Sequence, residues 1–138
     1  MKSTLRIACS RENLQQVRDF VRGYLQQHAL PDVAVNQVVL AVDEVVANFI
    51  IHANGEDARQ FLELRLGLLG YRLDVEIEDH GPNLFLPAAS PVAPNLAAHI
   101  REGRKGGMGM TLVSRIMDRV EFFERGNHTV CHLRKVLA

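Results

Sequence analysis

Three polar residues interrupt a long apolar stretch at a spacing of four. Glu44, Asn48 and His52 stand among valine, alanine, phenylalanine and isoleucine residues, and positions four apart share one face of an α-helix. An unpaired carboxylate in such surroundings costs several kcal/mol, so the stripe indicates a polar cleft that holds a cation and water. The oxygen of Asn48 suits Mg²⁺, and Glu44 could accept a proton. The alternative is an amphipathic surface helix, with His52 as a capping or packing residue.

A second short motif, Asp79-His80-Gly81, ends a strand-like alternation. Gly81 permits a positive φ or a close backbone approach, and a buried Asp79 could accept a hydrogen bond from the exocyclic amine of adenine. Because adenine is neutral, its recognition depends on a fixed acceptor and a flat apolar slot. The alternative interpretation is an ordinary Asp-x-Gly-Pro turn.

The third motif is rich in glycine. Residues 106–109 read Gly-Gly-Met-Gly, open a predicted helix and follow the basic pair Arg104-Lys105. Glycines let backbone N–H groups approach an anion, and the helix start presents the positive end of its dipole. The motif is neither a Walker A loop nor a dinucleotide fingerprint, because no strand precedes it and no Lys-Ser/Thr pair ends it. It predicts phosphate binding, and the alternative is a flexible hinge.

Helical periodicity predicts the elements that carry the first and third motifs. Apolar residues recur at helical spacing after Ser10, which is a candidate N-cap. A second helix is predicted from Pro31-Asp32 to about His52, with apolar residues around most of its circumference, so we expect it to be buried on more than one side. A third helix is predicted over 108–117.

Alternation of apolar and polar residues predicts the strands. A short strand is expected over 5–9, and a hairpin over 61–79 with Gly70 at its turn. A final hairpin is expected around Gly126-Asn127. Residues 83–105 show no periodicity, and a loop this long is usually functional, often a lid. The order favours one α/β (α+β) domain over 1–138, a two-layer sandwich whose mostly antiparallel sheet is covered by helices on one face.

Composition limits the classes of function. Lys+Arg and Asp+Glu both number 16, and this balance argues against direct binding of nucleic acid or of an anionic membrane. We expect no apolar run long enough to span a bilayer and no signal peptide, and therefore a cytoplasmic protein. Cys9 and Cys131 match no metal or redox spacing, so both are expected to be reduced core or strand residues.

Taken together, the three motifs resemble the N box and the two glycine boxes of the GHKL superfamily, the ATPases shared by DNA gyrase, sensor histidine kinases and mismatch-repair proteins. Within it, the chain is most similar to the anti-sigma-factor serine kinases. Residues 41–52 resemble their first box, and residues 107–118 resemble their glycine box. Asn54-Gly55 follows the first box with no obvious equivalent in the family.

The resemblance implies a Bergerat-type ATP-binding fold with ATP and Mg²⁺ as cofactors. Glu44 would be the general base, Asn48 would hold Mg²⁺, and Asp79 would contact adenine in a pocket that Gly81 shapes. Further nucleotide contacts are implied under a lid of about residues 83–105, at Lys105, Gly107, Met108, Gly109 and Thr111.

The resemblance also implies partners. The substrate would be a STAS-domain anti-sigma-factor antagonist phosphorylated on serine, a sigma factor or other regulated protein would be sequestered, and homodimers are common in the family. One alternative is a noncatalytic switch in which nucleotide occupancy sets partner affinity, although Glu44 counts against it because binding needs no base. The other is the ATP-binding part of a histidine kinase, which would need a helical phosphoacceptor segment that this sequence lacks.

Overall fold

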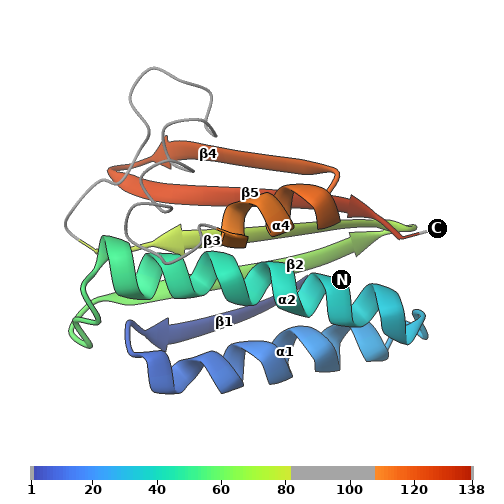
Figure 1. Cartoon of the computed structure of the whole chain (residues 1–138), viewed down its shortest axis with the longest axis horizontal. Coiled ribbons are helices and arrows are strands. Elements are labelled where there is room, and N and C mark those ends of the chain that lie inside the picture. Colours follow the sequence, from blue (N-terminus) through green and yellow to red (C-terminus); the bar gives the residue numbers. More distant parts are fainter. Residues whose placement is uncertain (1, 82–107, 138) are drawn as a thin grey trace.

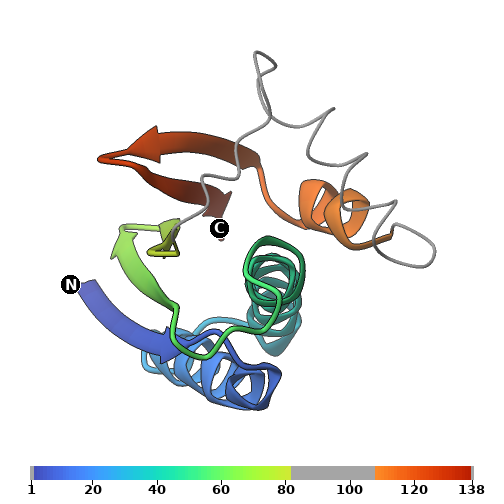
Figure 2. The same cartoon turned by 90° about the vertical axis from the view of Figure 1, so that its left-hand side faces the viewer.

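In residues 2–81 and 108–137, which the computed structural model describes, three α-helices cover one face of a five-stranded sheet (Figures 1 and 2). The expected fold class is therefore confirmed. The strands are β1 (Lys2–Ala8), β2 (Phe61–Leu69), β3 (Arg72–Asp79), β4 (Arg119–Arg125) and β5 (His128–Val136), and the helices are α1 (Leu14–Gln26), α2 (Asp32–Asn48) and α4 (Met108–Ile116).

The sheet has the strand order β1-β2-β3-β5-β4, and every neighbouring pair is antiparallel. Both predicted hairpins are confirmed, and their turns use residues that tolerate positive φ. Gly70 has a φ of 62°, while Gly126 and Asn127 have φ values of 55° and 72°, as the tight turn between twisted strands requires. Strand β3 is thus central and paired on both sides.

Side chains alternate strictly across the central strand. Leu73, Val75 and Ile77 are fully buried beneath the helices, whereas Asp74, Glu76 and Glu78 lie on the opposite face, in ion pairs with arginine and histidine residues. This period of two follows from the pleat of an extended strand. One face of the sheet therefore builds the core, and the other is polar.

Helix α2 is buried on more than one side, as predicted. It packs between α1 and α4, and its residues Val38, Val42 and Val46 have no exposed surface. The expectation that no segment is long and apolar enough to span a bilayer is wrong by length and composition, because Asp32–Ala53 meets both criteria with a mean hydropathy of 1.6. Its packing against the sheet and two helices accounts for this apolar character.

The start of α1 and the end of α2 differ in detail from what the sequence predicts. Ser10 precedes a short 3₁₀ turn, Arg11–Asn13, but its hydroxyl caps no backbone N–H. Instead, the Asn13 side chain donates to the carbonyl of Ala8 at 3.0 Å. The second difference is at the end of α2. This helix continues into a π-helical segment, η2 (Phe49–Ala53), where hydrogen bonds span five residues rather than four.

Both cysteines are buried and free, which agrees with the expectation of reduced core residues. Burial raises the pKa of the Cys9 thiol to about 12 and also raises the pKa of Cys131. Because the nucleophile is the thiolate, neither residue is suited to nucleophilic chemistry near neutral pH.

Replacing Tyr24 by phenylalanine should lower the free energy of unfolding by about 1 kcal/mol. The Leu68 N–H donates to the Tyr24 hydroxyl at 3.0 Å. Leu68 lies one residue beyond Gly67, which pairs with Lys2 at the end of the β1–β2 ladder. The variant therefore leaves the Leu68 N–H without this acceptor. Urea unfolding measures the change. Tyr71→Phe is the matched control, because Tyr71 is 65% exposed, and an equal loss there would contradict the assignment.

Candidate functional site

Helices α2 and α4, which carry the first motif and the described part of the third, cover one face of the sheet, and the central strand β3 carries the second motif. Helix α2 and strand β3 both end on the left of Figure 1, and α4 packs beside α2. Met108 and Gly109 open α4, and Thr111 lies exposed in its first turn. Lys105, Gly107 and the predicted lid at 83–105 lie outside the described residues.

The first motif lies in the second half of α2. Asn48 is only 5% exposed, and Glu44 is half-buried one turn before it. Asp43 pairs with Arg18 of α1 at 2.8 Å, which shows that this neighbouring carboxylate faces α1. Successive residues of a helix are rotated by about 100°, so Glu44 leaves the helix in a different direction from Asp43. The structure thus keeps Glu44 and Asn48 on one stripe.

His52 lies beyond the end of α2. It lies in η2, where the Asn54 N–H donates to the carbonyl of Phe49 at 3.1 Å, a span of five residues. The wider turn changes the rotation from one residue to the next. The regular helix places Glu44 and Asn48 on a common face, as their spacing predicts, and the place of His52 on that face stays a prediction.

Asp79 is a buried carboxylate with a fixed orientation. It is 2% exposed at the end of β3. The Asn54 amide nitrogen donates to both of its oxygens, at 3.0 and 3.1 Å, and the Gly81 N–H donates to Oδ1 at 2.8 Å. A fixed acceptor is one of the two features on which the predicted recognition of a neutral base depends, together with a flat apolar slot.

Burial and hydrogen bonding act in opposite directions on Asp79. Burial disfavours the charged form and raises the pKa of the carboxyl, while the Gly81 N–H and the Asn54 amide partly offset that rise. A carboxylate has about four acceptor positions, and these described donors occupy three of them. Oδ2 could therefore accept one more hydrogen bond, for example from an exocyclic amine.

Gly81 is confined by the same two side chains. A Cβ atom at this position would overlap Asn54 Oδ1 and would lie 3.0 Å from Asp79 Oδ1. The requirement for glycine is therefore close approach of side chains rather than a positive φ, which were the two possibilities that the sequence left open.

The sequence identified Asn54 only as a residue after the first box with no obvious equivalent in the family, so the role of its side chain was missed. Its amide group donates to the carbonyl of Phe49 at 3.0 Å as well as to Asp79, so it connects the end of the first motif to the second. The signal was its position two residues after His52, at the point where the sequence departs from the family pattern. Its partner, however, is 25 residues away.

Comparison with known proteins gives one family and several relatives. The sequence profile of the histidine kinase-like ATPase domain matches residues 7–135. The serine-protein kinase RsbW of Bacillus subtilis is 28% identical over 98 residues, which are 70% of this chain and 61% of that protein. RsbW of Bacillus velezensis is 26% identical over the same shares. The chain thus spans about three fifths of the length of these curated relatives.

The similar solved structures share 14% sequence identity with this chain, so they support the fold alone. The structure of the RsbU and RsbW domains of Rv1364c from Mycobacterium tuberculosis aligns with a TM-score of 0.69, covering 99% of this chain and 32% of that one. A chain of the SiaB–SiaC complex from Pseudomonas aeruginosa aligns with a TM-score of 0.58, covering 96% and 88%. Both alignments span the strands and helices that hold Asn48 and Asp79.

Gly81→Ala should destabilise the protein, whereas Gly23→Ala should not. The new methyl group would displace Asn54, whose hydrogen bonds to Asp79 and Phe49 would be lost, at a cost of about 1–3 kcal/mol. Gly23 lies within α1 with nothing near the added Cβ, so alanine should stabilise that helix by up to about 1 kcal/mol. Urea unfolding of both variants checks this contrast. Equal stability of the two would show that Asn54 can move freely.

Proposed function

The chain belongs to the family of histidine kinase-like ATPase domains, and on this premise we propose that it is an ATP-dependent protein serine kinase. Its substrate would be a STAS-domain antagonist of an anti-sigma factor, and it would also sequester a partner such as a sigma factor. The names of the two RsbW relatives, serine-protein kinases, support the reaction. One chain of the SiaB–SiaC complex has a similar fold, and its place in a complex supports binding of a partner protein.

The buried carboxylate of Asp79 is the observation that carries the nucleotide-binding part of the proposal. A charged group at 2% exposure is destabilising unless its acceptors are used. Asn54 and Gly81 occupy most of the acceptor positions of the carboxylate and fix the direction of the position that remains. A neutral donor such as the adenine amine would supply the remaining hydrogen bond to Asp79. An ordinary surface turn needs no such burial.

Asn48 fits a role as a magnesium ligand. It is a buried carboxamide in the second half of α2, one turn after Glu44. Mg²⁺ takes oxygen ligands, retains several waters and is usually bound through one or two protein groups together with substrate phosphates. When bound, it would neutralise charge on the transferred phosphoryl group. The protein would then contribute positioning and a base rather than a covalent step.

Glu44 is the proposed base. The serine hydroxyl of the partner would give its proton to this carboxylate as the serine oxygen bonds to the terminal phosphorus. The bond from that phosphorus to the bridging oxygen would break, and ADP would leave with that oxygen. This in-line transfer requires that the acceptor hydroxyl and the phosphates meet in one geometry. Glu44 is half-buried, so a docked partner could reach it.

Glu44→Ala should bind ATP with near-normal affinity but lose phosphoryl transfer, by about 100-fold or more, because a general base contributes about 10²–10⁴-fold. The assay incubates the full chain with Mg-ATP and the STAS-domain protein encoded nearest its gene, and records the intact mass of that partner. The substrate gains one phosphate with the wild-type protein.

Asp43→Ala is the matched control for this experiment. It removes the neighbouring carboxylate, which pairs with Arg18 instead of facing the same direction as Glu44, so transfer should persist. Near-normal transfer by Glu44→Ala would refute the base assignment. If the wild-type protein binds ATP and captures the partner without modifying it, the protein is a nucleotide-gated sequestering switch instead of a kinase.

Asn48→Ala should remove the dependence of ATP binding on magnesium. ATP affinity is measured by calorimetry with Mg²⁺ and with EDTA, and the ratio of the two should fall toward one in this variant. Asn36→Ala is the control, because Asn36 lies exposed on the same helix, where it contacts Arg22 at 3.3 Å. A preserved magnesium dependence in Asn48→Ala would show that another group holds the ion.

A further inference from the structure

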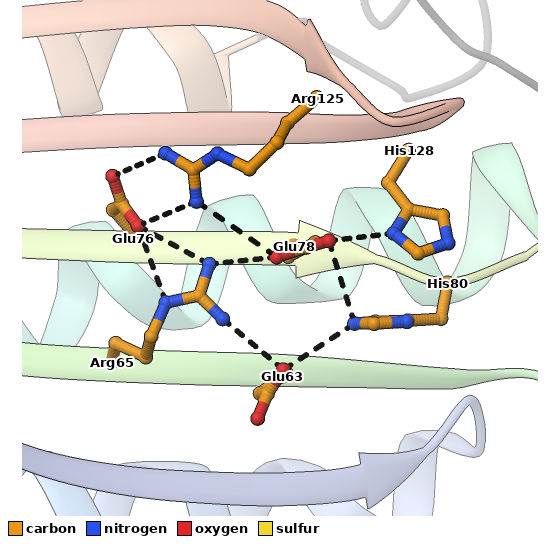
Figure 3. Close-up of polar contacts among 7 residues, drawn as sticks. All are labelled: Glu63, Arg65, Glu76, Glu78, His80, Arg125 and His128. Carbon is orange, nitrogen blue, oxygen red and sulfur yellow. Dashed lines mark hydrogen bonds and ion pairs between the residues drawn. The ribbon is translucent and has the colours of Figure 1, made fainter.

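The face of the sheet opposite the helices carries a connected set of charged side chains (Figure 3). Arg65 of β2 lies at its centre and pairs with Glu63, Glu76 and Glu78 at 3.1, 3.2 and 2.8 Å. Arg125 of β4 also pairs with Glu76, at 3.0 Å. Three carboxylates thus share two guanidinium groups, and the set has an excess of negative charge.

Two histidines extend this set at the end of β3. Glu78 Oε2 lies 2.6 Å from His128 Nδ1 and 3.7 Å from His80 Nε2, and one ligand atom from each of the three residues lies within 4.8 Å of the others. Figure 3 shows both rings directed toward the Glu78 carboxylate. Strand β5 supplies His128, and the other two residues flank Asp79.

His80 Nε2 is a buried nitrogen without a hydrogen-bond partner among the described residues. Its nearest acceptors are Glu63 Oε1 at 3.4 Å and Glu78 Oε2 at 3.7 Å. The ring is held in place on the other side, since it stacks on Phe61 with 4.4 Å between centroids. A buried ring nitrogen that lies near two carboxylates without a hydrogen bond to either is available to a further group.

We propose that Glu78, His80 and His128 bind a divalent transition-metal ion such as Zn²⁺ on this open face of the sheet. Imidazole nitrogen and carboxylate oxygen are ligands that zinc takes, and three protein ligands leave one position for water or another group. Calcium and magnesium are disfavoured because they prefer oxygen ligands alone. Both cysteines are buried in the core, so the thiols take no part.

The distances fit such an ion after small movements. Ligands about 2.1 Å from a tetrahedral zinc ion lie about 3.4 Å from each other. The separation of Glu78 Oε2 from His80 Nε2 is 3.7 Å, and its 2.6 Å contact with His128 Nδ1 would open as the ion replaces the hydrogen bond. His128 retains 31% of its side-chain exposure, so the ion has a path from solvent.

Arg65 acts as the outer partner of this site. It donates to Glu78 Oε1 at 2.8 Å, which leaves Oε2, the oxygen nearest both histidines, for the ion. Hydrogen bonds of this kind orient ligands and are themselves important for affinity. Arg65 also pairs with Glu63, the carboxylate nearest His80 Nε2 and a candidate for the fourth position.

The proposed metal site is separate from the proposed nucleotide site. Glu78 and His80 are two residues apart on the open face, whereas Asp79 between them lies on the helix-covered face with Asn54. Adjacent residues of a strand point to opposite faces. The inference therefore does not depend on kinase activity, and its test needs no nucleotide.

The test is a titration of the purified full chain with Co²⁺ and Zn²⁺, without nucleotide or Mg²⁺. We expect one ion per chain, a visible Co²⁺ spectrum that Zn²⁺ abolishes, and a Tm that rises with metal concentration, as for any ligand that binds the folded state. His128→Asn should weaken binding by more than the about 10–100-fold expected for loss of an outer partner.

His132→Asn is the matched control. This histidine lies on the same strand and face, and it contacts Asp74 at 2.8 Å and Glu121 at 3.2 Å, but it is outside the cluster. His132→Asn should bind the metal ion with the same affinity as the wild-type chain. Absence of saturable one-to-one binding by the wild-type chain would overturn the proposal, as would an equal loss in both variants. Glu78→Gln provides a second ligand variant should His128→Asn fail to fold.

Discussion

A carboxylate at 2% exposure can remain charged only where donors surround it, and much of the candidate site depends on meeting that requirement at Asp79. The donors come from the Gly81 N–H and from Asn54, which also holds the carbonyl of Phe49 at the end of the long core helix. Because of this arrangement, the end of β3 and the end of η2 stay in contact, and Gly81 must remain small. The long core helix, the turn that follows it and the central strand are therefore held in a fixed arrangement around the Asp79 carboxylate.

The pleat of β3 divides the molecule into two chemical environments. Ile77 and Asp79 face the helices, where burial is almost complete, and Glu76 and Glu78 face the open side, where arginines and histidines pair with them. Neighbouring residues in the chain therefore lie in different surroundings: one belongs to the proposed nucleotide-binding region, and the next to an ionic surface with metal-ligand geometry. The period of two in an extended strand is sufficient to explain this division.

The sequence was informative wherever the deciding interactions are local. The hairpins follow from alternation and from Gly70 and Gly126-Asn127, and the burial of α2 follows from valines on nearly every side. Two features depended on distant contacts and could not be read in this way. The hydrogen bonds from Asn54 to Asp79 span 25 residues, and the cluster of Glu78, His80 and His128 needs the pairing of β3 with β5. The π-helical turn that contains His52 has no periodic signature. The roles predicted for the site residues, from Glu44, Asn48 and Asp79 to the glycine box, stay predictions.

The two-sided pairing of β3 constrains how this protein can vary. Its register is set by β2 on one side and β5 on the other, and a shift of one residue would exchange the faces of all its side chains. Deleting one residue before Asp79 would direct carboxylates into the core and leucine, valine and isoleucine into water. In this strand, substitutions that respect the alternation are the tolerable form of change, while insertions and deletions are confined to the connecting turns, such as Gly70-Tyr71.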